Sequence, residues 1–119
     1  MTQTEWLHSL NPSTTLNQMQ EYIRHVIALR GFQEETPQEC LLMLVEEVGE
    51  LAKALRKSSG MYIDPARLEN YDTVQSEVAD VFILLVSLSN AAGINLLDAV
   101  IEKETANSQR QWVQPATDS

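Results

Sequence analysis

The sequence predicts an all-α fold, with four helices in a bundle, and three observations lead to this prediction. Apolar residues recur at helical spacing in four segments, residues that commonly begin or end helices bound these segments, and no segment is read as a strand. The chain has 119 residues, 44% of them hydrophobic, which suits one compact domain. We expect a helical domain over residues 15–112, an N-terminal tail over residues 1–14 and a flexible C-terminal tail over residues 113–119.

The first two expected helices have clear boundaries. Apolar side chains recur every three or four positions over residues 15–30, and Gly31 is a natural stop for the first helix. The second helix has the clearest start signal in the chain, because Thr36 can cap it and Pro37 suits its first position. This helix should continue to about Lys57, where cations suit the negative end of the helix dipole.

A connector over residues 61–72 separates the first two helices from the last two. The third expected helix covers residues 73–90 and is apolar in nearly every direction, which is typical of a helix that is buried all round. The fourth covers residues 95–109, with Asn95 as its cap and Asp98 three residues later. Because a chain this small has little internal surface to cover the third helix, we expect a homodimer or a dimer of dimers.

The composition excludes several classes of protein. The chain has 17 acidic and 8 basic residues, a net charge of −9 and a pI of about 4.5, so it is a poor candidate for binding nucleic acid. Cys40 is the single cysteine, which fits a reducing, cytoplasmic location. Residues 1–12 do not resemble a signal peptide, and the longest apolar run, residues 81–86, is too short to span a membrane.

Two pairs of acids stand at helical spacing. Glu47 and Glu50 share a direction on the second helix, Glu77 and Asp80 share one on the third, and apolar residues flank both pairs. Carboxylates on so apolar a helix need compensation, and the third helix contains no basic residue. If the two pairs face each other, a hard cation such as Mg²⁺ or Mn²⁺ would resolve their repulsion. Glu46 points to the outer side, as a surface residue or an auxiliary ligand.

Two other interpretations of these acids were weighed. Pairs of the form Glu-x-x-Glu are common on helices and usually solvated, so the metal site depends on the second pair. A di-iron helical bundle would pair Glu-x-x-His motifs on facing helices. The single Glu-x-x-His here joins Glu5 to His8 in the expected N-terminal tail, and His25 follows no glutamate at that spacing.

The acid motifs resemble those of the MazG family, in three blocks that follow one another in the expected order. The blocks are Glu46-Glu47-Val48-Gly49-Glu50-Leu51-Ala52, then Glu77-Val78-Ala79-Asp80-Val81, then Lys103, Asn107 and Arg110. The resemblance implies an all-α, usually dimeric or tetrameric enzyme that needs Mg²⁺ and cleaves nucleoside triphosphates to a monophosphate and pyrophosphate. It also implies that Glu47, Glu50, Glu77 and Asp80 hold the metal. The size and motif context look closest to compact single-domain members, which include the dCTP pyrophosphatases.

The expected chemistry is hydrolysis by a metal-activated water, which Glu47 or Glu50 orients or deprotonates. Lys103 and Arg110 are expected to clamp the phosphates, with Asn107 adding a hydrogen bond. Lys53, Arg56 and Lys57 are the alternative cations for this task.

Phe32 is the candidate for stacking on the base, since dCTP-directed relatives carry an aromatic at this position; Tyr22, Tyr62 and Trp112 are weaker candidates. We expect a house-cleaning enzyme or one that controls nucleotide pools. A phosphoribosyl-ATP pyrophosphatase and a non-catalytic helical module that binds a partner are the alternatives.

Overall fold

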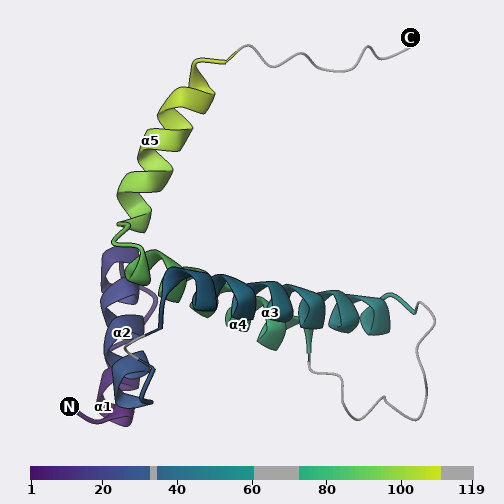
Figure 1. Ribbon diagram of the computed structural model, residues 1–119, viewed down its shortest axis with the longest axis horizontal. Helices are drawn as coiled ribbons and strands as arrows, with labels where there is room; N and C mark the ends of the chain where they lie inside the picture. The colour runs from purple at the N-terminus through teal and green to yellow at the C-terminus, as the bar shows by residue number, and fades with distance from the viewer. Residues whose placement is uncertain (33–34, 61–72, 111–119) are drawn as a thin grey trace.

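The computed structural model describes residues 1–32, 35–60 and 73–110, and these residues form an all-helical structure, as predicted. Five helices are present in the described residues instead of the four expected, because a short helix lies within the expected N-terminal tail. They are α1 (Gln3–His8), α2 (Leu16–Leu29), α3 (Pro37–Ser58), α4 (Val74–Ala91) and α5 (Leu96–Ser108) (Figure 1).

Helix α1 is stabilised by its contacts with α2. The hydroxyl oxygen of Thr2 caps it by accepting the backbone N–H of Glu5 at 3.1 Å. The ring of Trp6 stacks on His25 of α2, with 4.1 Å between ring centroids and 12° between the ring planes. A helix of six residues is marginal by itself, so this packing accounts for an element that periodicity could not indicate.

The longer helices begin where the sequence predicts. Each is preceded by a residue whose side-chain oxygen accepts the N–H of the residue three positions later, which satisfies one of the unpaired donors of a helix start. These capping residues are Thr15, Thr36, Thr73 and Asn95. Between α4 and α5 the chain turns at Gly93, whose φ of 71° favours glycine.

Helices α3 and α4 run side by side in opposite directions and form the main packed pair of the molecule, while α2 packs across the end of α4 (Figure 1). Helix α5 leaves the corner after α4 and runs away from this pair. It has no buried residue. The helices of one chain therefore do not close into the expected four-helix bundle.

The buried core is small. Among the described residues, the buried hydrophobic side chains are Ile23, Val26, Cys40, Ala54 and Val86. They come from α2, α3 and α4 and lie mostly where these three helices meet. The expectation that residues 73–90 are buried all round is wrong for the single chain, because most of α4 has only one neighbouring helix.

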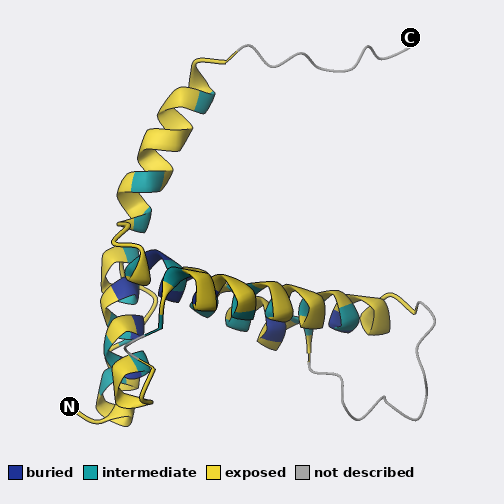
Figure 2. Ribbon diagram, in the orientation of Figure 1, coloured by how far each residue is buried: buried dark blue, intermediate teal, exposed yellow. Residues whose placement is uncertain are grey.

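Much of the packed pair is exposed (Figure 2), and its exposed residues include two apolar stripes. The α3 stripe consists of Leu41, Val45, Val48 and Leu55, and the α4 stripe of Val78, Phe82 and Leu85. Both follow the helical repeat of three or four residues, so each occupies one side of its helix. Exposed apolar rows of this length are typical of a surface that binds another protein.

Helix α4 is also long and apolar enough to cross a membrane, judged by length and composition alone, with 18 residues and a mean hydropathy of 1.3. One such helix is weak support for a membrane span, because the core helix of a globular protein has the same character. Glu77 and Asp80, on the part of α4 that packs on α3, favour the second explanation.

Candidate metal centre

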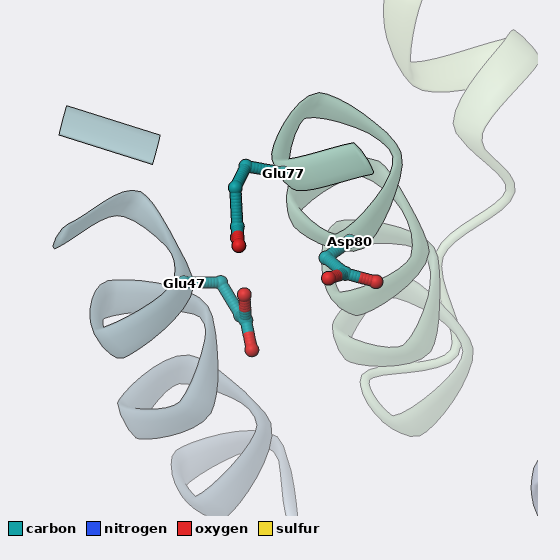
Figure 3. Close-up of side chains that lie close together, drawn as sticks. All are labelled: Glu47, Glu77 and Asp80. Atoms are coloured by element: carbon teal, nitrogen blue, oxygen red, sulfur yellow. The ribbon is translucent and has the colours of Figure 1, made fainter. Parts of the chain in front are cut away.

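Three carboxylates meet between α3 and α4. Glu47 reaches across from α3, while Glu77 and Asp80 come from successive turns of α4 (Figure 3). One carboxylate oxygen from each residue lies within 4.8 Å of the others. The spacing of three residues places the two α4 acids on one side of their helix, and the packing of the pair turns that side toward Glu47.

The cluster of Glu47, Glu77 and Asp80 combines like charge with burial. Glu77 is only 3% exposed, and Glu47 is half-buried. Two unit charges at this separation repel by about 1 kcal/mol in water and about 3 kcal/mol at an effective dielectric constant of 20. A hard divalent cation would reverse this repulsion, and three carboxylates are the kind of oxygen donors that Mg²⁺ and Mn²⁺ bind. The residues present therefore fit such an ion.

Glu50 and Glu46, the other two acids of this stretch of α3, lie outside the cluster. Glu50 is exposed, and its Oε2 lies 3.5 Å from Nζ of Lys53 in an ion pair along the helix. Three residues correspond to 300° of helical rotation, so Glu50 is turned by about 60° from Glu47. Glu46 is exposed on α3. Their predicted roles, as a ligand or base and as an auxiliary, remain predictions.

Of the predicted phosphate-binding residues, Lys103 and Asn107 lie in the second half of α5, and Arg110 lies just beyond its end. Lys103 and Arg110 are exposed, and Asn107 donates a hydrogen bond to Glu104 at 3.2 Å. The carboxylate cluster is near the start of α4, and α5 begins beyond the other end of that helix and points away (Figure 1). Within one chain the structure does not bring these side chains to the cluster. Lys53, Arg56 and Lys57, the alternatives, lie on the last part of α3.

Phe32, the predicted base-stacking residue, lines a cavity of about 240 Å³ and is half-exposed. The cavity lies where α2, the start of α3 and the end of α4 meet, and its lining also includes Arg24, Glu35, Cys40 and Asn90. Sequence reasoning did not connect these residues, because they come from four separate stretches and follow no common spacing. Of the weaker candidates, Tyr22 lies half-buried on α2, and Tyr62 and Trp112 lie outside the described residues.

Cys40 is buried in the wall of this cavity. Its thiol donates a hydrogen bond to Oε2 of Glu35 at 3.8 Å. Burial, followed by the charge and hydrogen bond of Glu35, raises the pKa of the Cys40 thiol above its ordinary value of 9.0. The thiol is therefore protonated at neutral pH and inert as a nucleophile.

Comparison with known proteins gives matches that cover both acid pairs. The family described as the MazG nucleotide pyrophosphohydrolase domain matches residues 35–110. dCTP pyrophosphatase 1 of Rattus norvegicus is 33% identical over 105 residues, or 86% of this chain and 62% of the relative. dCTP pyrophosphatase 1 of Mus musculus is 33% identical over 103 residues, or 84% and 61%. The matched part of the chain thus spans about three-fifths of the length of these relatives.

Proposed function

The chain belongs to the MazG nucleotide pyrophosphohydrolase family, and from this premise we propose that it hydrolyses nucleoside triphosphates to a nucleoside monophosphate and pyrophosphate. The observation that carries the proposal is the cluster of Glu47, Glu77 and Asp80, with oxygens within 4.8 Å of one another inside the region that matches the family. Three converging carboxylates repel one another, and a divalent cation held between them would offset that repulsion.

In the proposed reaction, Glu47, Glu77 and Asp80 would hold a divalent cation, Mg²⁺ or Mn²⁺. The ion supplies charge neutralisation on the phosphate oxygens and makes water a better nucleophile at neutral pH. Glu50 lies one turn along α3 from Glu47 and outside the cluster, so we assign it the orientation of the attacking water. The Glu50 carboxylate also pairs with Lys53 of the same helix, whose Nζ lies 3.5 Å from its Oε2.

For the substrate, we propose a pyrimidine deoxynucleoside triphosphate, with dCTP as the first compound to test. This extends to the present chain what the names of its two relatives say of them. The cavity beside Phe32 lies further along the same α3–α4 pair as the carboxylates and offers one aromatic face for the base. A house-cleaning or pool-controlling role follows if modified dNTPs are also cleaved.

We further propose that two copies assemble, as a homodimer or as a dimer of dimers. The α3 and α4 stripes are exposed in one chain, and α5 has no buried residue. The two stripes and α5 therefore all need a covering surface. A second copy would supply that surface. Lys103, Asn107 and Arg110 of one copy would then lie near the carboxylates of the other copy, whereas within one chain they do not reach the carboxylates. On this arrangement each site draws phosphate-binding residues from both copies.

The test of the activity is pyrophosphate release from a panel of standard and modified (d)NTPs and phosphoribosyl-ATP, with and without Mg²⁺. Asp80→Asn removes one carboxylate of the cluster and should lower kcat by at least about a hundredfold, the usual effect of losing an electrostatic group at a reacting centre. Glu102→Gln, the same kind of charge change on exposed α5, is the matched control and should retain activity. Metal-independent release, or equal activity of the two variants, would contradict the proposal and favour a non-catalytic helical module.

A further inference from the structure

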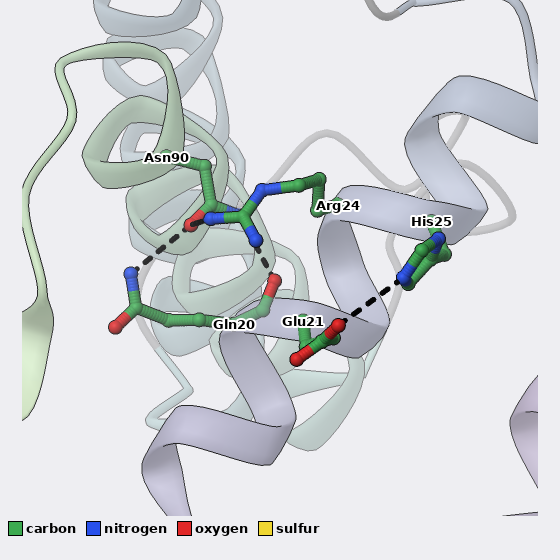
Figure 4. A network of polar contacts seen from close by, with 5 residues as sticks. All are labelled: Gln20, Glu21, Arg24, His25 and Asn90. Atoms are coloured by element: carbon green, nitrogen blue, oxygen red, sulfur yellow. Dashed lines mark hydrogen bonds and ion pairs between the residues drawn. The ribbon is translucent and has the colours of Figure 1, made fainter.

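The side chain of Gln20 is a buried amide that joins three helices. It lies on α2 and is 5% exposed. Its Nε2 donates to Oδ1 of Asn90 at 3.0 Å and to the backbone oxygen of Ile94 at 2.9 Å, while its Oε1 accepts the backbone N–H of Leu96 at 2.8 Å. In return, Nδ2 of Asn90 donates to the backbone oxygen of Gln20 at 3.0 Å (Figure 4). Both amide hydrogens of Gln20 and one lone pair are thus used.

These bonds meet at the corner between α4 and α5. Leu96 is the first residue of α5, and its N–H is one of those that have no partner within their own helix. Gln20 therefore caps α5 from another helix, beside the local cap that Asn95 provides. A second bond supports the corner, from Nδ2 of Asn95 to Oδ1 of Asn17 on α2 at 2.9 Å.

The corner matters because α5 has little else to fix its direction. The helix contains 13 residues and none of them is buried. Its apolar side chains Leu97, Val100 and Ile101 are exposed in the single chain. When no apolar packing holds a helix, the hydrogen bonds at its start set its direction. At the start of α5, Gln20 makes the buried hydrogen bonds.

The same group of residues borders the cavity beside Phe32. Oδ1 of Asn90 also accepts a bond from the Arg24 guanidinium at 3.4 Å, and both residues line that cavity. Gln20 holds the side-chain amide of Asn90 in one orientation because both ends of that amide bond to it. Oδ1 of Asn90 accepts from Nε2 of Gln20, and Nδ2 of Asn90 donates to the backbone oxygen of Gln20. One side chain thereby connects the wall of the cavity to the base of α5.

We propose that Gln20 is a positioning residue, which fixes the direction of α5 relative to α2 and α4 of its own chain and so places the α5 side chains that act on the substrate in the site of the other copy. The second part of this statement rests on the proposed function, since it takes Lys103, Asn107 and Arg110 as phosphate-binding groups. The first part is a property of the fold alone. Isosteric replacement separates Gln20 from an ordinary buried residue, because neither a carboxylate nor an apolar chain can make the same three side-chain bonds.

The experiment compares Gln20→Glu and Gln20→Met with the matched control Gln38→Glu, which makes the same change on the exposed first turn of α3. Hydrogen exchange of the full chain, resolved by segment, is the structural measurement. We expect amides of α5 to exchange at least about tenfold faster in Gln20→Met, which loses the three side-chain bonds at the corner, while α3 and α4 keep their protection. Gln20→Glu loses the two donated bonds but keeps an oxygen for the Leu96 N–H, so we expect a smaller acceleration in that variant. Unchanged exchange in α5 in both variants, or equally faster exchange in every helix, would overturn the proposal.

The functional measurement is the split between KM and kcat for dCTP with Mg²⁺. A misplaced α5 should raise KM several-fold with kcat little changed, whereas a merely structural defect lowers the active fraction, and with it kcat, at constant KM. Constant KM in both variants overturns the functional part. If the unmodified protein releases no pyrophosphate from any compound, the proposed function fails, and hydrogen exchange still decides whether Gln20 positions α5.

Discussion

Glu77 places a carboxylate where a side chain chosen for stability would be apolar. It is 3% exposed and faces Glu47 across the α3–α4 contact, with Asp80 one turn away. Each pairwise repulsion in this cluster opposes folding in the absence of a cation. If the cluster holds a cation, as we propose, the metal-bound protein is more stable than the metal-free protein, and this difference can be measured.

At the scale of single residues, we expect Asp80→Asn to stabilise the metal-free protein by about 1 kcal/mol, because it removes one of three like charges at nearly constant shape. Mg²⁺ should raise the Tm of the unmodified protein, since a ligand that binds the native state stabilises it, and should leave the Tm of the variant almost unchanged. Thermal unfolding with EDTA and with Mg²⁺ measures both effects.

Glu102→Gln serves as the control for a general effect of net charge. If this variant gains as much stability as Asp80→Asn, the gain comes from the overall charge of −9 and the repulsion within the cluster is not its source.

Cys40 allows a prediction about pH. Because burial and Glu35 raise its pKa in the folded state above 9.0, the folded chain holds the thiol proton more tightly than the unfolded chain does. The resulting stabilisation is fully present below the unfolded pKa and is lost as the pH rises from 9.0 through the folded pKa. We expect the free energy of unfolding to fall more steeply between about pH 8 and pH 10 in the unmodified protein than in Cys40→Ala. Urea unfolding across this range measures the two slopes, and parallel slopes would contradict the assigned environment.

At the scale of elements, a helix that starts at a local cap also needs a packing partner to remain folded. The capping residues before α2 to α5 set where these helices begin, and they are visible in the sequence. Helix α1 has a cap as well, in Thr2, but its six residues depend on the stacking of Trp6 on His25. A capping residue can therefore set where a short helix begins without stabilising the helix enough by itself.

This dependence predicts that Trp6→Ala releases α1. The stacked pair and the area it covers contribute about 1 kcal/mol or more, which exceeds what a six-residue helix retains by itself. Hydrogen exchange over residues 3–8 should reach the rate of an unfolded segment, while α2 beyond His25 stays protected. Leu7→Ala, at an exposed neighbouring position of the same helix, should leave α1 in place, and equal loss in both variants would show that the stacking is not the cause.

At the scale of the whole molecule, the described helices leave two apolar stripes uncovered. The α3 and α4 stripes lie on the part of the chain that a closed bundle would have buried. A second copy is the covering partner that we propose for them.

The assembly can be tested by changing the α3 stripe. Val45 is 62% exposed in the single chain, so an aspartate there costs the folded chain little, but it would place a charge inside the proposed contact. We expect Val45→Asp to reduce the mass measured by light scattering to that of one chain, while the isosteric Val45→Thr keeps the assembled mass. A protein that is monomeric before any substitution would contradict the proposed assembly directly.

Particular residues show how far the sequence leads. The pair Glu77 and Asp80 could be singled out because two acids stand on an otherwise apolar helix. Glu47 and Glu50 could not be ranked, since both lie beside the apolar face of their helix, and the packing angle of α3 on α4 brings Glu47 alone into the cluster. The role of Gln20 was not foreseen, because its partners are 70 to 76 positions away and no local spacing reveals them.

The sequence by itself determined the helical class, the start of each long helix, the two acid pairs and the resemblance to a family that was then found to match residues 35–110. These properties depend on contacts within about one helical turn or on residue types in a fixed order, which a sequence states directly. The tertiary structure alone decided which acids meet, that α1 forms, that α5 points away from the carboxylates and that much of α4 lies open. These four features depend on how helices that are distant in the chain pack together. Many weak contacts decide that packing, and no single residue determines it.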